Sequence, residues 1–389
     1  MAISYSLMKT IFHSTKSVTK FYRALFALAG WIALPNLSPA ATDSVRFQVV
    51  QLPSTGDANS STLAVQVADF NGDGNADVAL PLDAPDLVLV YYGDGHGGFS
   101  AGQGFGAGSY PHAMVVGDFN EDGKVDVAVA ATSGEDGVEV LLNNGAGGFL
   151  SPVFFRAGEF LTGLAVGDFD RDGHQDIAAP GGRSQHLTVL RGDGHGDFKK
   201  SGVFDVGIAT SLAIGDYNMD GIPDLAAVGS LQLLILQGDG TGSFAVVHTY
   251  PLPGDGAGIV TADFNHDNRL DVAVSEINGD PTVVFLGNGD GSFTAGAQVQ
   301  APDAQGLAAP DLNGDGNLDL AVPTYSTGSV MIALGRGNGN FRRGHVIEFA
   351  RHTAPIAAAV GDFNADGRQD MVMANYTGGG ATVLLNLPR

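Results

Sequence analysis

The chain has 389 residues, with 42 Asp and Glu against 19 Lys and Arg and a formal net charge of −23. This acidity argues against a nucleic-acid partner, which would require a basic face. There is no Cys, so a disulfide scaffold is excluded, and the chain lacks the thiolates that most structural zinc sites use.

Residues 1–40 are typical of an export signal. Four basic residues and no acids precede an apolar core of eleven residues, Ala24 to Leu34, and Ser38-Pro39-Ala40 supplies small residues before a cleavage point ahead of Ala41. This core is too short to cross a bilayer, which takes about 20 residues. The alternative is an amphipathic targeting or membrane-anchoring segment. We expect a mature chain, residues 41–389, that is secreted to an extracellular or periplasmic location and has no membrane span.

An apolar segment, residues 45–52, precedes the first copy of a loop that occurs seven times. The loop runs from Asp69 to Asp77 and recurs at intervals of 47 to 51 residues, starting at Asp118, Asp168, Asp216, Asp263, Asp311 and Asp362. Each copy reads Asp-x-Asn/Asp-x-Asp-Gly-x-x-Asp, except that Asn268 replaces the Gly at position 6. Such a period predicts a repeat architecture with one structural unit per loop.

The residue types in this loop suit a hard cation such as calcium, which takes about six to eight oxygen ligands. Side chains at positions 1, 3 and 5 can converge if the backbone curls, and Gly at position 6 permits a sharp turn with positive φ. Position 7 can offer its carbonyl oxygen, and the Asp at position 9 can complete the shell. An acidic turn without metal is the alternative, but its carboxylates repel one another unless a cation neutralises them.

Other calcium motifs do not fit this spacing. An EF-hand requires Glu at position 12, whereas that position is apolar in all seven copies: Leu80, Val129, Ala179, Ala227, Val274, Val322 and Met373. The nonapeptide repeats of calcium-binding β-helices have a much shorter period.

The remainder of each repeat predicts four antiparallel strands. In the second repeat an apolar segment, residues 113–117, precedes the loop, and two further apolar segments, residues 127–130 and 138–142, follow it. A Gly-rich turn then ends in Phe149 and leads into a more polar fourth strand. The turn occurs six times, ending at Phe99, Phe149, Phe198, Phe244, Phe293 and Phe341. Its glycines suit a tight hairpin, and each Phe supplies a packing anchor.

These units predict an all-β chain folded as a seven-bladed β-propeller of four-stranded antiparallel blades. No segment has a sustained helical period, so no helix is expected. The last unit stops at its third strand, residues 382–386, while residues 45–52 form a strand that belongs to no unit. We therefore expect the N-terminal strand to complete the last blade and close the ring. Seven blades use residues 41–389, which leaves no room for a separate catalytic domain.

The chain resembles the FG-GAP, or VCBS, repeat proteins, whose best-known members form the heads of integrin α subunits. In that family, a loop of this pattern joins the first and second strands of a blade and binds calcium. Unlike integrin heads, this chain carries the loop in every blade and lacks leg domains and a transmembrane helix, so it looks more like stand-alone secreted bacterial members. The resemblance implies that the side-chain ligands are Asp69, Asn71, Asp73, Asp77, Asp118, Asn120, Asp122, Asp126, Asp168, Asp170, Asp172, Asp176, Asp216, Asn218, Asp220, Asp224, Asp263, Asn265, Asp267, Asp271, Asp311, Asn313, Asp315, Asp319, Asp362, Asn364, Asp366 and Asp370.

Up to seven calcium ions are expected, in a structural role, because no loop offers the paired acid and base that hydrolysis requires. Ligand binding is expected on the opposite rim, where the repeats differ: residues 82–86, 132–137, 180–186, 276–281, 324–328 and 375–380. The side chains of interest there are Tyr110, His112, Phe160, Arg183, His186, Tyr325, His352 and Tyr376. Ordinary solvated loop residues are the alternative for each of them.

The favoured function is therefore a monomeric binding or adhesion module for an extracellular protein or glycan, with no catalytic residues. A lectin and a polysaccharide-acting enzyme are the alternatives. The only Trp, Trp31, lies in the predicted signal, which weakens the lectin because carbohydrate sites favour flat aromatic platforms. The chain could also be one part of a larger surface assembly. The rim residues match no recognition motif that would identify the ligand.

Overall fold

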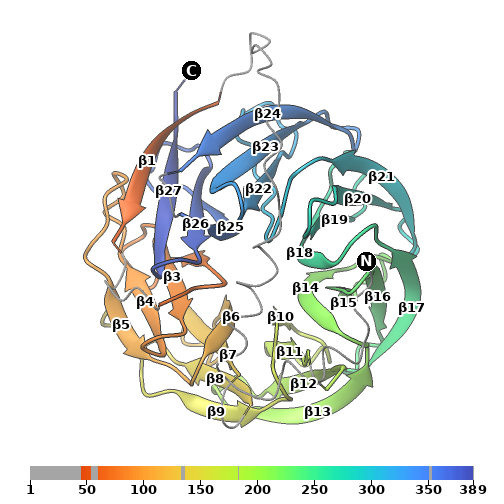
Figure 1. Cartoon of the computed structure of the whole chain (residues 1–389). Helices are drawn as coiled ribbons and strands as arrows, with labels where there is room; N and C mark the ends of the chain where they lie inside the picture. The colour runs from red at the N-terminus through yellow and green to blue at the C-terminus, as the bar shows by residue number, and fades with distance from the viewer. Residues whose placement is uncertain (1–44, 54–59, 133–135, 183, 350–352, 389) are drawn as a thin grey trace. The chain divides into compact units, whose positions relative to one another are not determined.

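The computed structural model describes residues 45–53, 60–132, 136–182, 184–349 and 353–388, which form 27 strands and no helix. Seven antiparallel sheets stand in a ring around a central axis, and β6, β10, β14, β18 and β25 lie at the inner ends of their blades (Figure 1). The predicted seven-bladed all-β propeller is thereby confirmed. The predicted signal, residues 1–40, lies outside the described residues. No helix in the described ranges could span a membrane.

The first three blades follow one another along the chain. Blade 1 comprises β2 (Gln66–Ala68), β3 (Asp77–Leu82), β4 (Leu87–Tyr91) and β5 (Gln103–Gly106). Blade 2 comprises β6 (Pro111–Gly117), β7 (Asp126–Ala131), β8 (Gly137–Leu141) and β9 (Val153–Arg156). Blade 3 comprises β10 (Ala165–Gly167), β11 (Asp176–Pro180), β12 (His186–Gly192) and β13 (Phe198–Asp205).

The remaining four blades complete the ring. Blade 4 comprises β14 (Ala209–Gly215), β15 (Asp224–Gly229), β16 (Gln232–Gly238) and β17 (Phe244–Pro251). Blade 5 comprises β18 (Gly256–Ala262), β19 (Asp271–Glu276), β20 (Thr282–Gly287) and β21 (Phe293–Val299). Blade 6 comprises β22 (Leu320–Thr324), β23 (Ser329–Gly335) and β24 (Phe341–Glu348). Blade 7 comprises β25 (Pro355–Gly361), β26 (Asp370–Asn375), β27 (Gly380–Leu387) and β1 (Arg46–Leu52).

The N-terminal strand closes the ring as predicted. β1 pairs antiparallel with β27, from Arg46 opposite Leu387 to Leu52 opposite Ala381. It thus supplies the fourth strand of blade 7, and the order of that sheet is β1-β27-β26-β25. On the other side of the joint, β2 of blade 1 contacts β25 of blade 7.

Two details differ from the sequence prediction. The second strand of six blades begins at position 9 of the loop, one residue earlier than predicted, because this Asp pairs with the first strand, as Asp126 does with Gly117. In blade 6 the innermost strand is reduced to isolated bridges from Ala304 to Thr324 and from Ala308 to Ala321. Pro310 has no N–H to donate to the ladder at the end of that segment, which shortens the pairing.

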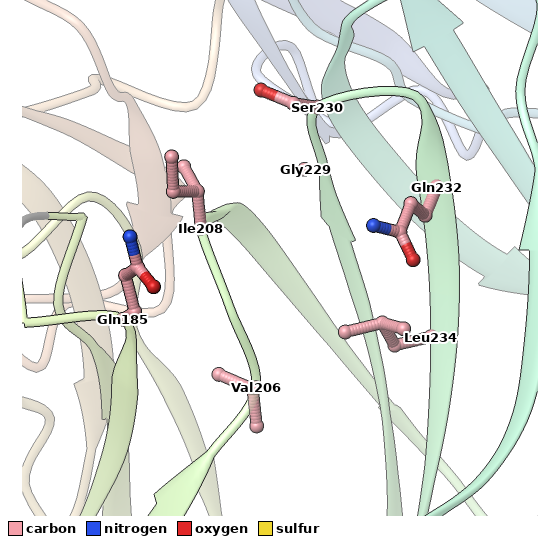
Figure 2. A pocket seen from close by; sticks show the side chains of 7 residues that line it. All are labelled: Gln185, Val206, Ile208, Gly229, Ser230, Gln232 and Leu234. Carbon is pink, nitrogen blue, oxygen red and sulfur yellow. The ribbon is translucent and has the colours of Figure 1, made fainter. Parts of the chain in front are cut away.

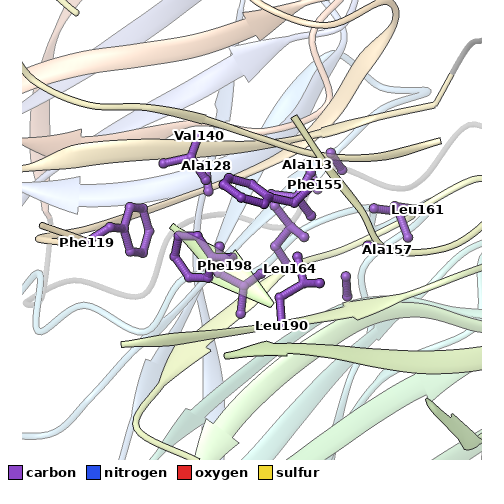
Figure 3. Packing of buried hydrophobic residues seen from close by; sticks show 14 residues of the cluster. Ala113, Phe119, Ala128, Val140, Phe155, Ala157, Leu161, Leu164, Leu190 and Phe198 are labelled. Atoms are coloured by element: carbon purple, nitrogen blue, oxygen red, sulfur yellow. The ribbon is translucent and has the colours of Figure 1, made fainter. Parts of the chain in front are cut away.

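The core lies between neighbouring blades. The second and third strands bury both faces, so they are almost continuously apolar, as in β7 and β15. Figure 3 shows the cluster between blades 2 and 3, in which Phe119 from the loop of blade 2 meets Phe198 from the hairpin of blade 3. Their ring centroids are 5.5 Å apart, edge to face. Equivalent aromatic pairs join five further interfaces: Phe70–Phe149, Phe169–Phe244, Tyr217–Phe293, Phe264–Phe341 and Phe363–Phe99.

Candidate metal centres

The seven acidic loops join the first and second strands of their blades, so they all lie at one end of the ring. All 28 predicted ligand residues are among those described. In each loop the Asp at position 1 accepts hydrogen bonds from the backbone N–H groups of positions 5 and 6. In blade 3, for example, Asp168 accepts from Asp172 at 3.1 Å and Gly173 at 3.0 Å. The side chain at position 3 accepts a further bond from position 5 in every loop. The backbone therefore curls around the first Asp as the sequence predicts.

The donor set of blade 3 fits a divalent cation. Carboxylate oxygens of Asp168, Asp170 and Asp176, at positions 1, 3 and 9, lie within 4.8 Å of one another. Asp172, at position 5, lies outside this group, and its Oδ1 accepts the N–H of His174. Three carboxylates this close favour a bound cation, because calcium binds oxygen ligands and cancels their mutual repulsion. In the other six loops position 3 is Asn, which offers an amide oxygen in the same place.

The Asp at position 9 has a second role that the sequence did not reveal. In blade 2, Asp126 is fully buried, and its two carboxylate oxygens accept the N–H of Phe119 at 2.9 Å and of Asn143 at 2.7 Å. The same two bonds, to position 2 and to the end of the third strand, recur in all seven blades. Each oxygen keeps a lone pair for a metal. The residue therefore joins the loop to the blade without the help of an ion.

Burial raises the pKa of every position 9 Asp, and the neighbouring carboxylates of the loop raise it further. The pKa rises to about 6 for Asp77, Asp176, Asp271 and Asp370 and to about 7 for Asp319. It is also raised for Asp126 and Asp224. Two backbone N–H bonds oppose the shift without cancelling it. A cation in the loop would favour the charged form of each group.

Backbone strain at position 4 was missed by the sequence analysis. Its φ is positive in all seven loops: Gly72 (75°), Glu121 (58°), Arg171 (62°), Met219 (62°), His266 (60°), Gly314 (65°) and Ala365 (53°). Five of these residues are not Gly, and each pays a steric cost for the left-handed region. Gly in only two of the copies was too weak a signal to identify the position. Position 6 has positive φ as predicted, including Asn268 at 62°.

Every loop is also tied to the next blade. The carbonyl of position 2 accepts a hydrogen bond from the following blade, for example Phe119 from Gly196 N–H at 2.9 Å. A backbone N–H donates in five of these contacts, and the side-chain amides of Asn143 and Asn386 donate in the other two, to Phe70 and Leu312. The conformation of each loop is thus coupled to a blade interface.

Direct contacts link neighbouring loops as well. The N–H of Asp311 in the blade 6 loop donates to Oε1 of Gln369 in the blade 7 loop at 2.6 Å. The His174 ring of blade 3 pairs with Glu121 of blade 2, which raises the pKa of His174. His266 of blade 5 bonds to Asn317 of blade 6 at 2.9 Å.

The opposite rim carries the predicted ligand-binding side chains only in part. Tyr110, His112 and Phe160 form an aromatic group between blades 2 and 3, with centroid distances of 5.1 Å and 5.6 Å from the His112 ring. His112 is buried rather than displayed, and burial lowers its pKa to about 4, so it is neutral at pH 7. Tyr325 and Tyr376 form a second pair at 5.6 Å, in which Tyr376 is buried and Tyr325 is half-buried. His186 is exposed, and Arg183 and His352 lie outside the described residues.

The same rim contains a small cavity of about 190 Å³ between blades 3 and 4 (Figure 2). It mixes amide, hydroxyl and apolar side chains, and it is lined by Gln185, Val206, Ile208, Gly229, Ser230, Gln232 and Leu234. Gln185 lies in the predicted ligand-binding segment 180–186, and the other six were not predicted. They come from a loop, a linker between blades and a hairpin, so no local sequence pattern marks them.

One buried acid on this rim stands apart from the loops. Glu276, at the end of β19, is fully buried, and its Oε2 accepts the N–H of Gly254. Burial raises its pKa to about 7, with further contributions from the charges of Asp280 and Asp255. The arrangement supplies a buried acid with a raised pKa, apart from the acidic loops.

Comparisons with known proteins give a family model and several related folds. The model of the FG-GAP-like repeat matches residues 69–129, 119–179, 216–274 and 311–373, more than half of the chain. No curated protein matches. Among solved structures, BBS1N in complex with ARL6DN is 15% identical with a TM-score of 0.61, over 87% of this chain and 98% of that one.

Two other solved structures have the same fold. An Agrocybe aegerita lectin, described by its specific recognition of non-reducing terminal N-acetylglucosamine, is 21% identical with a TM-score of 0.53, over 82% of this chain and 86% of that one. A catalytically inactive virginiamycin B lyase from Staphylococcus aureus with quinupristin is 12% identical with a TM-score of 0.61, over 88% and 100%. At these identities the likeness concerns the fold alone.

Proposed function

Because the chain belongs to the FG-GAP-like repeat family of β-propeller proteins, we propose that it is an exported, monomeric binding module stabilised by calcium. One observation carries the proposal: the same acidic loop is repeated in all seven blades at one end of the ring, while the loops at the other end differ. A loop pattern that is the same in every blade suits a structural role that every blade needs. Divergent loops on a rigid scaffold are where binding specificity is usually found.

Calcium would be held by the side chains at positions 1, 3, 5 and 9, with the carbonyl at position 7. The convergence of Asp168, Asp170 and Asp176 supports this assignment. The ion would neutralise the loop and join its two ends. Since position 9 is tied to the third strand and position 2 to the next blade, an ion in one loop stabilises both its blade and an interface. Metal that binds only the folded state stabilises it by mass action.

The ligand would bind on the opposite rim, and we propose an extracellular protein as that ligand. The two aromatic groups, Tyr110–His112–Phe160 and Tyr325–Tyr376, support this location. Tyr110 and Phe160 both have positive φ, at 61° and 55°, and strain of this kind is concentrated at binding sites. Aromatic side chains supply much of the energy of protein interfaces.

The proposal has a two-part test on the mature protein. Bound calcium is measured by elemental analysis, and thermal unfolding is compared in calcium and in EDTA. We expect several ions per chain and a melting temperature that falls sharply in EDTA. Protein that holds no calcium and melts identically in both buffers would contradict the metal assignment.

Ligand binding is then screened on arrays of extracellular proteins and of glycans. We expect a protein hit that weakens in a Tyr110→Ser/Phe160→Ser variant. It should persist in a Val153→Ser/Val203→Ser control, which changes exposed residues on the outer strands β9 and β13. Binding that the rim variant leaves unchanged would contradict the rim as the binding face.

A lectin is the second candidate, favoured by the cavity between blades 3 and 4. Amide and hydroxyl groups of Gln185, Gln232 and Ser230 beside Ile208 and Leu234 suit one small polar ring with an apolar face. The propeller lectin with the same fold recognises a terminal N-acetylglucosamine. Binding to one glycan family that is lost in Gln232→Ala would establish this function in place of the first.

A further inference from the structure

Three of the seven acidic loops carry a cation at position 7: Lys124 in blade 2, Arg269 in blade 5 and Arg368 in blade 7. The other four carry Asn75, His174, Ile222 and Asn317 there. We propose that the three cations are built-in counter-ions that divide the calcium loops into two affinity classes. The loops of blades 2, 5 and 7 bind calcium more weakly and depend on it less than those of blades 1, 3, 4 and 6. This inference rests on the proposed calcium binding.

Each of the three cations contacts the same atom of its loop. The Lys124 ammonium lies 2.6 Å from Oδ2 of Asp122, the Asp at position 5. The guanidinium groups of Arg269 and Arg368 contact Oδ2 of Asp267 and Asp366 in the same way. In all three loops the backbone N–H of the cationic residue donates to the other oxygen, Oδ1. One residue therefore engages both oxygens of a predicted ligand.

The neutral amide of position 3 donates to Oδ2 of the position 5 Asp in blades 1, 4, 5 and 6, at 2.8 to 3.0 Å. In blade 5 the Arg269 guanidinium contacts the same oxygen as well, whereas position 7 of blades 1, 4 and 6 is a neutral residue. In blade 3, His174 turns away from its own loop toward Glu121. Arg191 contacts Asp170 at 2.9 Å, but Asp170 is an extra acid at a position that is Asn in the other loops. Arg191 therefore offsets that additional charge, so Asp168, Asp172 and Asp176 remain, as the three Asp do in blades 1, 4 and 6. Arg171, at position 4 of the same loop, lies beside Gly240 of blade 4.

The cation affects the loop in two opposite ways. With calcium bound, a unit positive charge faces a doubly charged ion across one carboxylate, which weakens binding by about tenfold at the dielectric of an exposed loop. Without calcium, the same charge offsets part of the repulsion among the three Asp of the loop. These loops therefore keep more of their stability in EDTA.

The test uses a triple variant, Lys124→Asn/Arg269→Asn/Arg368→Asn, which gives each loop the residue found in blades 1 and 6. Its charge-matched control is Lys199→Asn/Lys200→Asn/Arg343→Asn, three exposed cations on the outer strands β13 and β24. Calcium binding is measured by isothermal titration at low ionic strength. Thermal unfolding is measured in calcium and in EDTA.

We expect the wild-type protein and the control to show four tighter sites and three that are about tenfold weaker. The triple variant should show a single class of seven sites and should melt at a lower temperature than the control in EDTA. The single variants Arg269→Asn and Arg368→Asn should each move one site to the tighter class. They keep the prediction testable if the triple variant folds only with calcium.

Two results would overturn the inference: seven equal sites in the wild-type protein, or a triple variant that titrates like the control. The second would mean that these are solvated surface ion pairs of little consequence. Neither result affects the proposed function. A wild-type protein that binds no calcium at all would instead contradict the proposed function itself.

Discussion

The Asp at position 9 should stabilise the propeller even without metal, and Asp77→Ala in blade 1 tests this directly. Asp77 is fully buried, and it accepts the N–H of Phe70 at 2.9 Å and of Gly93 at 2.8 Å. The substitution leaves both buried N–H groups without an acceptor. It therefore removes a side-chain link between the loop, the second strand and the end of the third strand of this blade.

The expected loss can be estimated from these contacts. A hydrogen bond from a backbone N–H to a charged acceptor contributes about 2 kcal/mol, which gives about 4 kcal/mol for two. Removing the carboxylate returns part of this, because burial disfavours its charge and raises its pKa to about 6. That rise of about 2 units corresponds to about 3 kcal/mol, which is reduced to about 1.5 kcal/mol by the water that reaches the loop. We expect Asp77→Ala to lower the free energy of unfolding by about 2.5 kcal/mol in EDTA.

The assay is urea unfolding in EDTA at pH 7.5, followed by far-ultraviolet circular dichroism and by tyrosine fluorescence. Coincident transitions and an unchanged dependence on urea are required before the midpoints are converted into free energies. Asp73→Ala is the matched control, because Asp73 is exposed at position 5 of the same loop and bonds only to Asn71 and Asn75 through its carboxylate. It should cost about 1 kcal/mol or less in EDTA, yet reduce the stabilisation by calcium.

The opposite pattern would refute this reasoning. If Asp77→Ala unfolds like the wild-type protein in EDTA and differs only in calcium, then Asp77 is a ligand and nothing more. The two buried N–H groups would then have found other acceptors, and the coupling of the loop to its blade would not pass through this carboxylate.

Three further predictions concern single positions. Gly287→Ala should destabilise the protein by about 2–4 kcal/mol in urea unfolding, because the added Cβ would lie 2.2 Å from the carbonyl oxygen of Leu270. The control Gly106→Ala should cost less, because its added Cβ would meet no atom within 4 Å. Ala365→Gly should stabilise by about 0.5–1 kcal/mol in the same assay, because exposed Ala365 has φ of 53°, and a loss of stability would contradict strain at position 4. Glu276→Gln should change the dependence of stability on pH. The pKa of Glu276 is about 7 in the folded protein, against an ordinary 4.5. The stability that the protein gains from keeping this side chain protonated is therefore fully present below pH 4.5 and is lost as the pH rises through 7. After a discount for screening by water at the rim, the free energy of unfolding of the variant should exceed that of the wild-type protein by about 1–2 kcal/mol at pH 8 and by almost nothing at pH 4.5. Urea unfolding at both pH values measures this difference. A difference that is the same at both pH values would contradict this.

The fold was accessible from the sequence because its signals repeat. Seven copies of one loop and six copies of one hairpin set the number of blades, and an unmatched strand at residues 45–52 predicted how the ring closes. The weak innermost strand of blade 6 was not foreseen, because the effect of Pro310 depends on which residue lies opposite it. Pairing partners are a property of the assembled sheet rather than of a local pattern.

The site could be predicted only where residues with oxygen-bearing side chains recur at a regular spacing. Residue types at alternate positions indicated the predicted ligands, but nothing in the sequence showed that Asp126 also binds Asn143, seventeen positions away. Position 4 escaped notice because residues as different as Met219 and Glu121 accept the same strained φ. On the other rim, His112 is buried between aromatic rings, although its surroundings read as an exposed loop. Such environments arise from neighbouring blades that a single repeat does not contain.

The joint between β1 and β27 sets the order in which the molecule can be completed. Gln51 and Thr382, whose side chains bond at 3.0 Å, are separated by 331 positions along the chain. Blades 1 to 6 rest mainly on contacts close in sequence and can form early in folding, whereas β1 stays unpaired until β27 is in place. During that interval its free edge can add to the β27 of a second chain, with the same register and the same hydrogen bonds. A strand-exchanged dimer is therefore the misassembly to which this topology is most exposed.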